Sequence, residues 1–263
     1  MTRHVARGFT LVELIAVMVV LSISATIGAS FIVDVVDQYQ KSSLRSSIVM
    51  RGAVTMEQMG RKLRQAVPNS VRVSGSGLCV EFLPLVGGSV YTEPVADNEN
   101  GRNAADTIQT VGLDIISGDA IYALVSPMSS AEVYSSASAA NVRAEIASLV
   151  GSPATAIQLA SAHRFVRNSV SKRVLVADRP ERYCVLGGQL VNYRDYLFVT
   201  DALTDGNPGG NTVVMADGVT AATAFALTVG SENRNAALDI AINFSGGSET
   251  VLLNSRVLIR NVP

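Results

Sequence analysis

The longest uncharged run of the chain lies close to its start. Residues 14–33 carry no formal charge, and a helix of that length, rising ~1.5 Å per residue, spans a hydrocarbon core of ~30 Å. One acid, Glu13, stands directly before this run. A carboxylate at the edge of a lipid-buried helix is costly unless it has a partner or a function. The pattern predicts a membrane-spanning helix over 9–33 that begins with a functional acid.

A second helical pattern follows the membrane segment. Apolar residues recur there at steps of three and four, which predicts an amphipathic helix over 34–67 whose apolar stripe packs on a sheet. The stripe consists of Leu44, Ile48, Met56, Met59, Leu63 and Val67. Gly52 lies inside the pattern, where it predicts a bend or a close approach of another element. Pro68 ends the helix, because the residue before a proline is pushed out of helical conformation.

Beyond Pro68 the pattern changes to short alternating runs separated by turn residues, which predicts strands. The predicted strands are 70–74, 78–83, 172–177, 182–186, 189–193, 196–200, 222–229, 236–244 and 250–259. Gly187-Gly188 and Ser245-Gly246-Gly247-Ser248 are predicted turns, since glycine accepts positive φ. An antiparallel sheet packed on the lower half of the helix is the simplest architecture, so we expect a β-rich domain over 68–263.

The middle of the chain has the least regular pattern. Residues 126–162 are rich in alanine and serine, with one helical candidate over 139–150 that Gly151 and Pro153 would stop. We expect a loop insertion over about 86–162 on the exposed face of the domain. Such a region either binds a surface or a partner protein, or is an ordinary exposed loop that binds no ligand.

Composition leaves room for one anchor and one sizeable domain, since the 263 residues are 16% charged with a formal net charge of −1. Residues 1–8 hold Arg3 and Arg7, and without them 19 basic residues face 22 acidic ones. This balance argues against nucleic-acid binding. Residues 34–66 are positive by three, which indicates a face near anionic lipid or acidic neighbours. A DNA-binding stripe is the alternative, although Tyr39 is the sole aromatic there.

The segment Gly8-Phe9-Thr10-Leu11-Val12-Glu13-Leu14 resembles the cleavage and methylation motif of type IV pilins and type II secretion pseudopilins. The resemblance implies a leader over 1–8, cut after Gly8 by a prepilin peptidase, and methylation of Phe9. It also implies that Glu13 pairs with the amino-terminal charge of a neighbouring subunit. Two charges at one membrane depth neutralise each other when helices pack side by side. An ordinary signal anchor with an unrelated acid is the alternative.

The same resemblance implies an α+β pilin fold, a long N-terminal helix packed on an antiparallel sheet domain. Basic residues beside a first span stay in the cytoplasm, so the domain is expected in the periplasm of a single-pass inner-membrane protein. Assembly would then carry it into a pilus at the cell surface. The implied partners are other minor and major pilins, the inner-membrane assembly platform and membrane lipid.

Downstream stretches narrow the resemblance. Met-Glu-Gln-Met-Gly-Arg-Lys-Leu-Arg over 56–64, followed by 66–70, is similar to the helix end of J-type minor pseudopilins and of large minor pilins of mannose-sensitive haemagglutinin (MSHA) pili. Segment 79–84, segment 182–184 with its hairpin to 193–194, and segment 261–263 resemble the O-type proteins of the latter. This implies a minor pilin that initiates or caps filament assembly at or near the filament tip. A pseudopilin of type II secretion is the nearest alternative, and an adhesin or DNA-binding module is the alternative from another class.

Two cysteines, Cys79 and Cys184, both fall in predicted strands outside the cytoplasm. A pair in an oxidising compartment usually closes a disulfide, and a loop of this length would contribute up to ~4–5 kcal/mol in the chain-entropy model. Two buried free thiols are the alternative.

The sequence gives little support for a metal site or for an enzyme active site. One candidate calcium site comprises Asp201, Asp205, Asn207 and Asp217 on a glycine-rich turn. Its spacing is not that of an EF-hand, and such residues are common in turns. His163 is the sole histidine after the leader, and Ser169 with Lys172 matches only a short S-x-x-K spacing. We expect no other cofactor and no enzymatic activity.

Overall fold

The computed structural model describes residues 8–136, 141–198, 202–230 and 235–260. The first helix, α1 (Leu11–Arg64), is assigned without a break through Gly28 and Gly52. The chain divides into two compact units, one ending at Ser47 and the other beginning at Ile48. In the first unit the apolar residues of α1 are exposed except for the half-buried Leu44, as a membrane-spanning or partner-covered segment requires.

The part of α1 in the second unit buries one face. Its buried residues are Ile48, Gly52, Thr55, Met56, Met59, Gly60 and Leu63. The predicted apolar stripe is therefore confirmed over this segment. The helix ends three residues earlier than expected, at Arg64, and the Val67 amide already donates to the Leu83 carbonyl at 2.8 Å.

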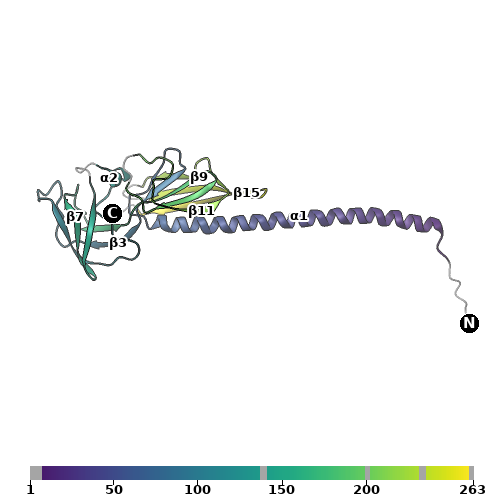
Figure 1. Ribbon diagram of the computed structural model, residues 1–263, viewed down its shortest axis with the longest axis horizontal. Helices are drawn as coiled ribbons and strands as arrows, with labels where there is room; N and C mark the ends of the chain where they lie inside the picture. The colour runs from purple at the N-terminus through teal and green to yellow at the C-terminus, as the bar shows by residue number, and fades with distance from the viewer. Residues whose placement is uncertain (1–7, 137–140, 199–201, 231–234, 261–263) are drawn as a thin grey trace, which may run out of the picture. The chain divides into compact units, whose positions relative to one another are not determined.

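Two antiparallel sheets lie alongside this half of α1 (Figure 1). The first has the order β1 (Arg72–Val73), β2 (Cys79–Phe82), β9 (Glu181–Leu186), β10 (Gln189–Arg194), β11 (Asn211–Asp217). The second contains β12 (Val219–Thr220), β13 (Phe225–Thr228), β14 (Ala236–Gly246) and β15 (Glu249–Ile259), with β14 central. Gly52 lets this sheet approach α1 closely, because a Cβ built there would meet Leu253 and the Phe244 ring. The fold class predicted from the sequence, a long helix packed on antiparallel sheets, is confirmed.

A third sheet occupies the middle of the chain and has six strands. Its order is β3 (Leu85–Val90), β8 (Arg173–Ala177), β5 (Tyr122–Leu124), β6 (Arg143–Gly151), β7 (Ala154–His163), β4 (Ala105–Leu113). The end strands approach each other at a bridge between Tyr91 and Thr110, so the sheet curls around its own core. A short helix, α2 (Ser130–Tyr134), is capped by Ser129, whose hydroxyl oxygen accepts a hydrogen bond from the Glu132 amide.

This third sheet corrects the expectation of a loop insertion over 86–162. It has a buried core that includes Val86, Ile108, Ile157 and Val176. The helix predicted over 139–150 is also wrong for the residues that the structure describes, since Arg143–Gly151 is strand β6. Alanine and serine favoured a helix locally, but pairing with β5 and β7 decides the structure of β6.

The remaining strand predictions agree with the structure, with one exception. Residues 196–198 form no strand, and 199 and 200 lie outside the described residues. The chain turns at Asp195, which has φ 57°, and Tyr196 then points its hydroxyl into a buried hydrogen bond with Glu81. The turns at Gly187-Gly188 and after β14 are confirmed. Strand β11 was missed, because its residues follow a glycine-rich loop that suggested only a turn.

Candidate functional site

The N-terminal site is built on the start of α1. Thr10 caps the helix, since the Glu13 amide lies 3.3 Å from its side-chain oxygen and 3.1 Å from its carbonyl. The cap fixes Glu13 in the first turn, where the positive end of the helix dipole favours a carboxylate. Phe9, just before the cap, is 80% exposed. Gly8, Phe9 and Glu13 are thus all accessible in this unit.

The helix that carries this site is long and apolar enough to cross a membrane. None of its most apolar window is buried by other parts of the described chain. A helix of this kind needs lipid or neighbouring helices to cover it, because exposed apolar surface on this scale is unfavourable in water.

The two cysteines lie directly opposite each other in β2 and β9. The structure joins Cys79 and Cys184 in a disulfide, with their Cα atoms 4.2 Å apart. Neither residue is exposed to solvent. The bond links the strands that precede and follow the six-stranded sheet in the chain, because all six strands of that sheet lie between β2 and β9 in sequence.

A buried charge network adjoins the disulfide. Glu81 is fully buried and accepts hydrogen bonds from Arg72 at 2.7 Å, from Arg182 at 2.8 Å and from the Tyr196 hydroxyl at 2.7 Å. Burial, and next the charge of Glu81, raise the pKa of Tyr196 far above its usual range, so this hydroxyl remains a donor. The guanidinium of Arg72 also lies 3.6 Å above the ring of Tyr134. The network holds β1, β2 and β9 in register with the segment that follows β10.

The network is not among the features predicted from the sequence, although the sequence contains a signal for it. Cys79 pairs with Cys184 in antiparallel strands, so Glu81 must stand opposite Arg182 in the same register. Opposite charges at equal distances from two bonded cysteines predict an ion pair.

The candidate calcium ligands do not form a metal site in the described part of the chain. Asp201 lies outside it. Asp205 accepts from the Ser76 hydroxyl at 2.6 Å, Asn207 from the Gly209 amide at 2.8 Å, and Asp217 from Gln189 at 2.6 Å. The described residues contain no group of three or more histidine, cysteine or acidic side chains that could hold a metal ion.

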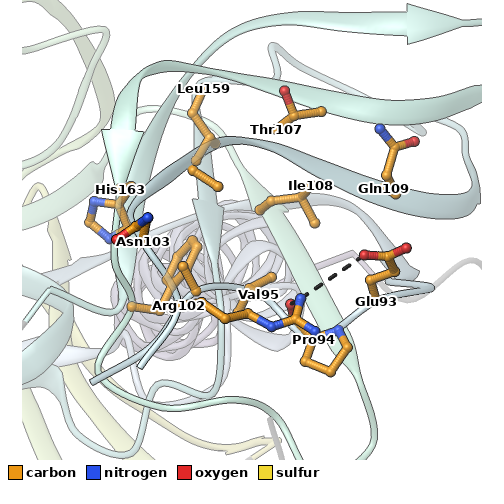
Figure 2. Close-up of a pocket in the computed structure, with 13 residues that line it drawn as sticks. Glu93, Pro94, Val95, Arg102, Asn103, Thr107, Ile108, Gln109, Leu159 and His163 are labelled. Atoms are coloured by element: carbon orange, nitrogen blue, oxygen red, sulfur yellow. Dashed lines mark hydrogen bonds and ion pairs between the residues drawn. The ribbon is translucent and has the colours of Figure 1, made fainter. Parts of the chain in front are cut away.

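A pocket of about 270 Å³ lies where β4 and β7 meet the segment before β4 (Figure 2). Arg102 crosses its floor, with its guanidinium 2.8 Å from the Pro94 carbonyl and 4.0 Å from the Glu93 carboxylate. His163 stands at one side, and its Nε2 lies 3.2 Å from the Asn141 carbonyl. Burial lowers the pKa of His163, so the imidazole is neutral at pH 7.

The two residues that match the S-x-x-K spacing, Ser169 and Lys172, do not form a hydrolytic site. Ser169 is buried, and its amide donates to the Tyr91 hydroxyl at 2.8 Å. Lys172 meets Ser169 through its backbone, where its amide donates to the Ser169 carbonyl at 2.9 Å. This hydrogen bond closes a turn before β8, so the S-x-x-K spacing has a structural explanation.

Comparison with known protein families finds one match. Residues 3–29 match the family model described as the prokaryotic N-terminal methylation motif, and this segment includes Gly8, Phe9 and Glu13. No curated protein and no solved structure matches the chain. The motif stands at the start of a long N-terminal helix packed on antiparallel sheets, and this combination is type IV pilin-like. It implies processing by a prepilin peptidase and anchoring in the inner membrane before assembly. Proteins of this kind are typically structural subunits without enzymatic activity.

Proposed function

We propose that this protein is a minor pilin of a type IV pilus of the MSHA kind, which initiates or caps filament assembly at or near the tip. The observation that carries the proposal is the methylation motif over residues 3–29, placed where an exposed apolar helix begins. The prepilin peptidase cuts after Gly8, and Phe9 becomes the methylated amino terminus. Glu13 then pairs with the amino-terminal charge of an adjacent subunit.

The proposed domain organisation follows from this function. Residues 1–8 are the leader, and 9–33 cross the membrane and later enter the filament core. Residues 34–67 form the amphipathic helix, and 68–263 form the periplasmic domain. The partners are other minor and major pilins, the assembly platform in the inner membrane and lipid.

The assignment of the protein as a minor pilin of an MSHA pilus rests on the resemblances of the segments downstream of the N-terminal motif. These include the segments around Cys79 and Cys184, which the structure places in paired strands. A minor pseudopilin of type II secretion shares the N-terminal motif and the fold. Deleting the gene separates the two, since a minor pilin is needed for pili and a pseudopilin for secretion of folded enzymes.

The first test is the intact mass and amino-terminal sequence of the protein from membranes and from sheared filaments. We expect a chain that begins at methylated Phe9 and is present in filaments. Glu13→Val should be processed normally yet be depleted from filaments, because the charge partner is lost while the cleavage site remains. Glu57→Val, at an exposed position later in α1, is the matched control and should assemble. A chain that still begins at Met1 and is absent from filaments would contradict the proposal.

An adhesin or DNA-binding role is the second candidate, and the pocket beside His163 is the observation that favours ligand binding. Deleting the alanine- and serine-rich segment 129–160 would not test the adhesin role, because this deletion removes β6 and most of β7. Arg102→Ala is the sharper change, since Arg102 crosses the pocket floor without a role in the core. Loss of adhesion with normal pili would support the adhesin, and unchanged adhesion would oppose it.

A further inference from the structure

A groove runs between α1 and strand β11. It consists of two cavities of about 460 and 560 Å³ that share Gln58 and Met215 and therefore adjoin each other. All of its lining residues belong to the second compact unit. The helix side contributes exposed Met50 and Val54, and the strand side contributes 213–217.

Strand β11 is an end strand that buries neither of its faces. It pairs with β10, and no other described strand pairs with its outer edge. Successive residues of a strand point to opposite faces, yet Val213 is 39% exposed and Val214 is 46% exposed. A register shift leaves Met215 without a partner in β10, so the regular part of the edge is 211–214. Uncharged β-branched residues on an open edge provide a template for another strand.

Positive charge accompanies this edge. Arg61, Lys62 and Arg194 line the larger cavity, and its described lining contains no acidic residue. Lys62 is neutralised by Glu181 at 2.5 Å. Arg61 and Arg194 form no ion pair with any described residue, and the Nε atom of Arg194 is buried without a hydrogen-bond partner. Two guanidinium groups are thus available to a carboxylate, the partner that their planar donors fit best.

We propose that this groove binds an extended, carboxylate-bearing segment of a partner protein, which pairs with β11 over 211–214 and places acidic side chains against Arg61 and Arg194. A protein strand fits the apolar part of the groove, Val213, Val214 and Met215, better than a nucleic acid does. Nucleic acids are held by phosphate contacts and by stacking on exposed aromatic rings, and the two aromatic residues of the groove lining, Tyr183 and Phe244, are only 2% and 4% exposed. The inference goes beyond the proposed function and does not depend on it.

The test uses the full chain in detergent and two fluorescent octapeptides of alternating sequence, valine with glutamate and valine with lysine. We expect fluorescence anisotropy to show that the wild type binds the glutamate peptide. Arg61→Glu should weaken this binding by on the order of tenfold and should gain binding to the lysine peptide, since like charges repel and opposite charges attract. Arg194→Gln should also weaken binding of the glutamate peptide. Lys172→Glu reverses an exposed charge outside the groove and should leave both affinities unchanged.

Hydrogen exchange of the wild type supplies a second measurement that needs no variant. The glutamate peptide should slow amide exchange within 211–214, because strand pairing engages backbone groups of the open edge. Equal binding of both peptides, equal affinity of wild type and Arg61→Glu, or protection confined to other segments would overturn the proposal. So would a mixed-sequence DNA duplex that binds more tightly than the glutamate peptide and loses affinity in Arg61→Glu.

Discussion

Replacing Glu81 by glutamine removes one negative charge from the buried network without changing its shape. The carboxylate of Glu81 is inaccessible to solvent, and the side chains of its partners Arg72 and Arg182 are only 10% and 3% exposed. The side-chain oxygen of glutamine can still accept the hydrogen bond of the Tyr196 hydroxyl. Its NH₂ group, however, is a donor that faces the N–H donors of a guanidinium group. Two buried cations then lack their counter-charge.

The structure sets the expected size of the effect. Removing one partner of a buried ion pair costs about 3–5 kcal/mol, because the remaining charge is neither solvated nor paired. For a domain of this size, 1 kcal/mol lowers the melting temperature by about 2–4 °C, so Glu81→Gln should melt roughly 6–20 °C below the wild type. High salt should change this difference little, because a buried pair is poorly screened.

Near-ultraviolet circular dichroism of tyrosine follows the transition well, since the chain has seven tyrosines and no tryptophan. Asp239→Asn is the matched control. It removes one charge from an ion pair with Arg256 that has similar distances, 2.7 and 2.8 Å, but is exposed to solvent. This control should shift the melting temperature much less. Equal melting temperatures for the two variants would refute the reasoning that burial decides the cost.

Three further predictions concern stability. Gly52→Val should destabilise the domain by about 1–3 kcal/mol by overpacking against the sheet, whereas Gly28→Val, where a Cβ meets nothing within 4 Å, should not; thermal melts check both. Reduction of the Cys79–Cys184 bond, which spans 105 residues, should add about two daltons to the intact mass and lower the free energy of unfolding in urea by up to ~4–5 kcal/mol. Burial lowers the pKa of His163 from its usual value of 6.5. Below pH 6.5 the unfolded state therefore binds the proton more readily than the folded state, and stability falls as pH drops. The His163→Gln variant should show a smaller loss in melting temperature between pH 7 and 5.5 than the wild type.

Local patterns sufficed for the helix and for the N-terminal site. The charge-free run after Glu13 and the three- and four-residue steps of the apolar stripe are properties of a single helix, so they can be recognised without the rest of the fold. The strand β9, the turn at Gly187-Gly188 and β10 were equally local. Gly52 inside the helical pattern predicts either a bend or a close approach of another element, and the structure shows the close approach in an unbroken helix.

The six-stranded sheet depends on contacts that a local pattern does not reveal. Strand β6 mixes alanine, serine and glutamate with few large apolar residues, and its structure is determined by β5 and β7 on either side. The pocket beside His163 combines residues from two segments of the chain that are at least fifty positions apart. Strand β11 lacks a buried face altogether, so no alternation marked it.

The position of the disulfide has a mechanical consequence. The chain leaves the first sheet after β2, builds the six-stranded sheet and returns at β9, and the Cys79–Cys184 bond joins these two strands where they pair. A pulling force on the six-stranded sheet reaches the rest of the domain through β2 and β9. Because a covalent bond carries this tension, the two strands cannot be unzipped past the cysteines under load. The six-stranded sheet therefore stays tethered to the first sheet under load even where its packing against that sheet is pulled apart.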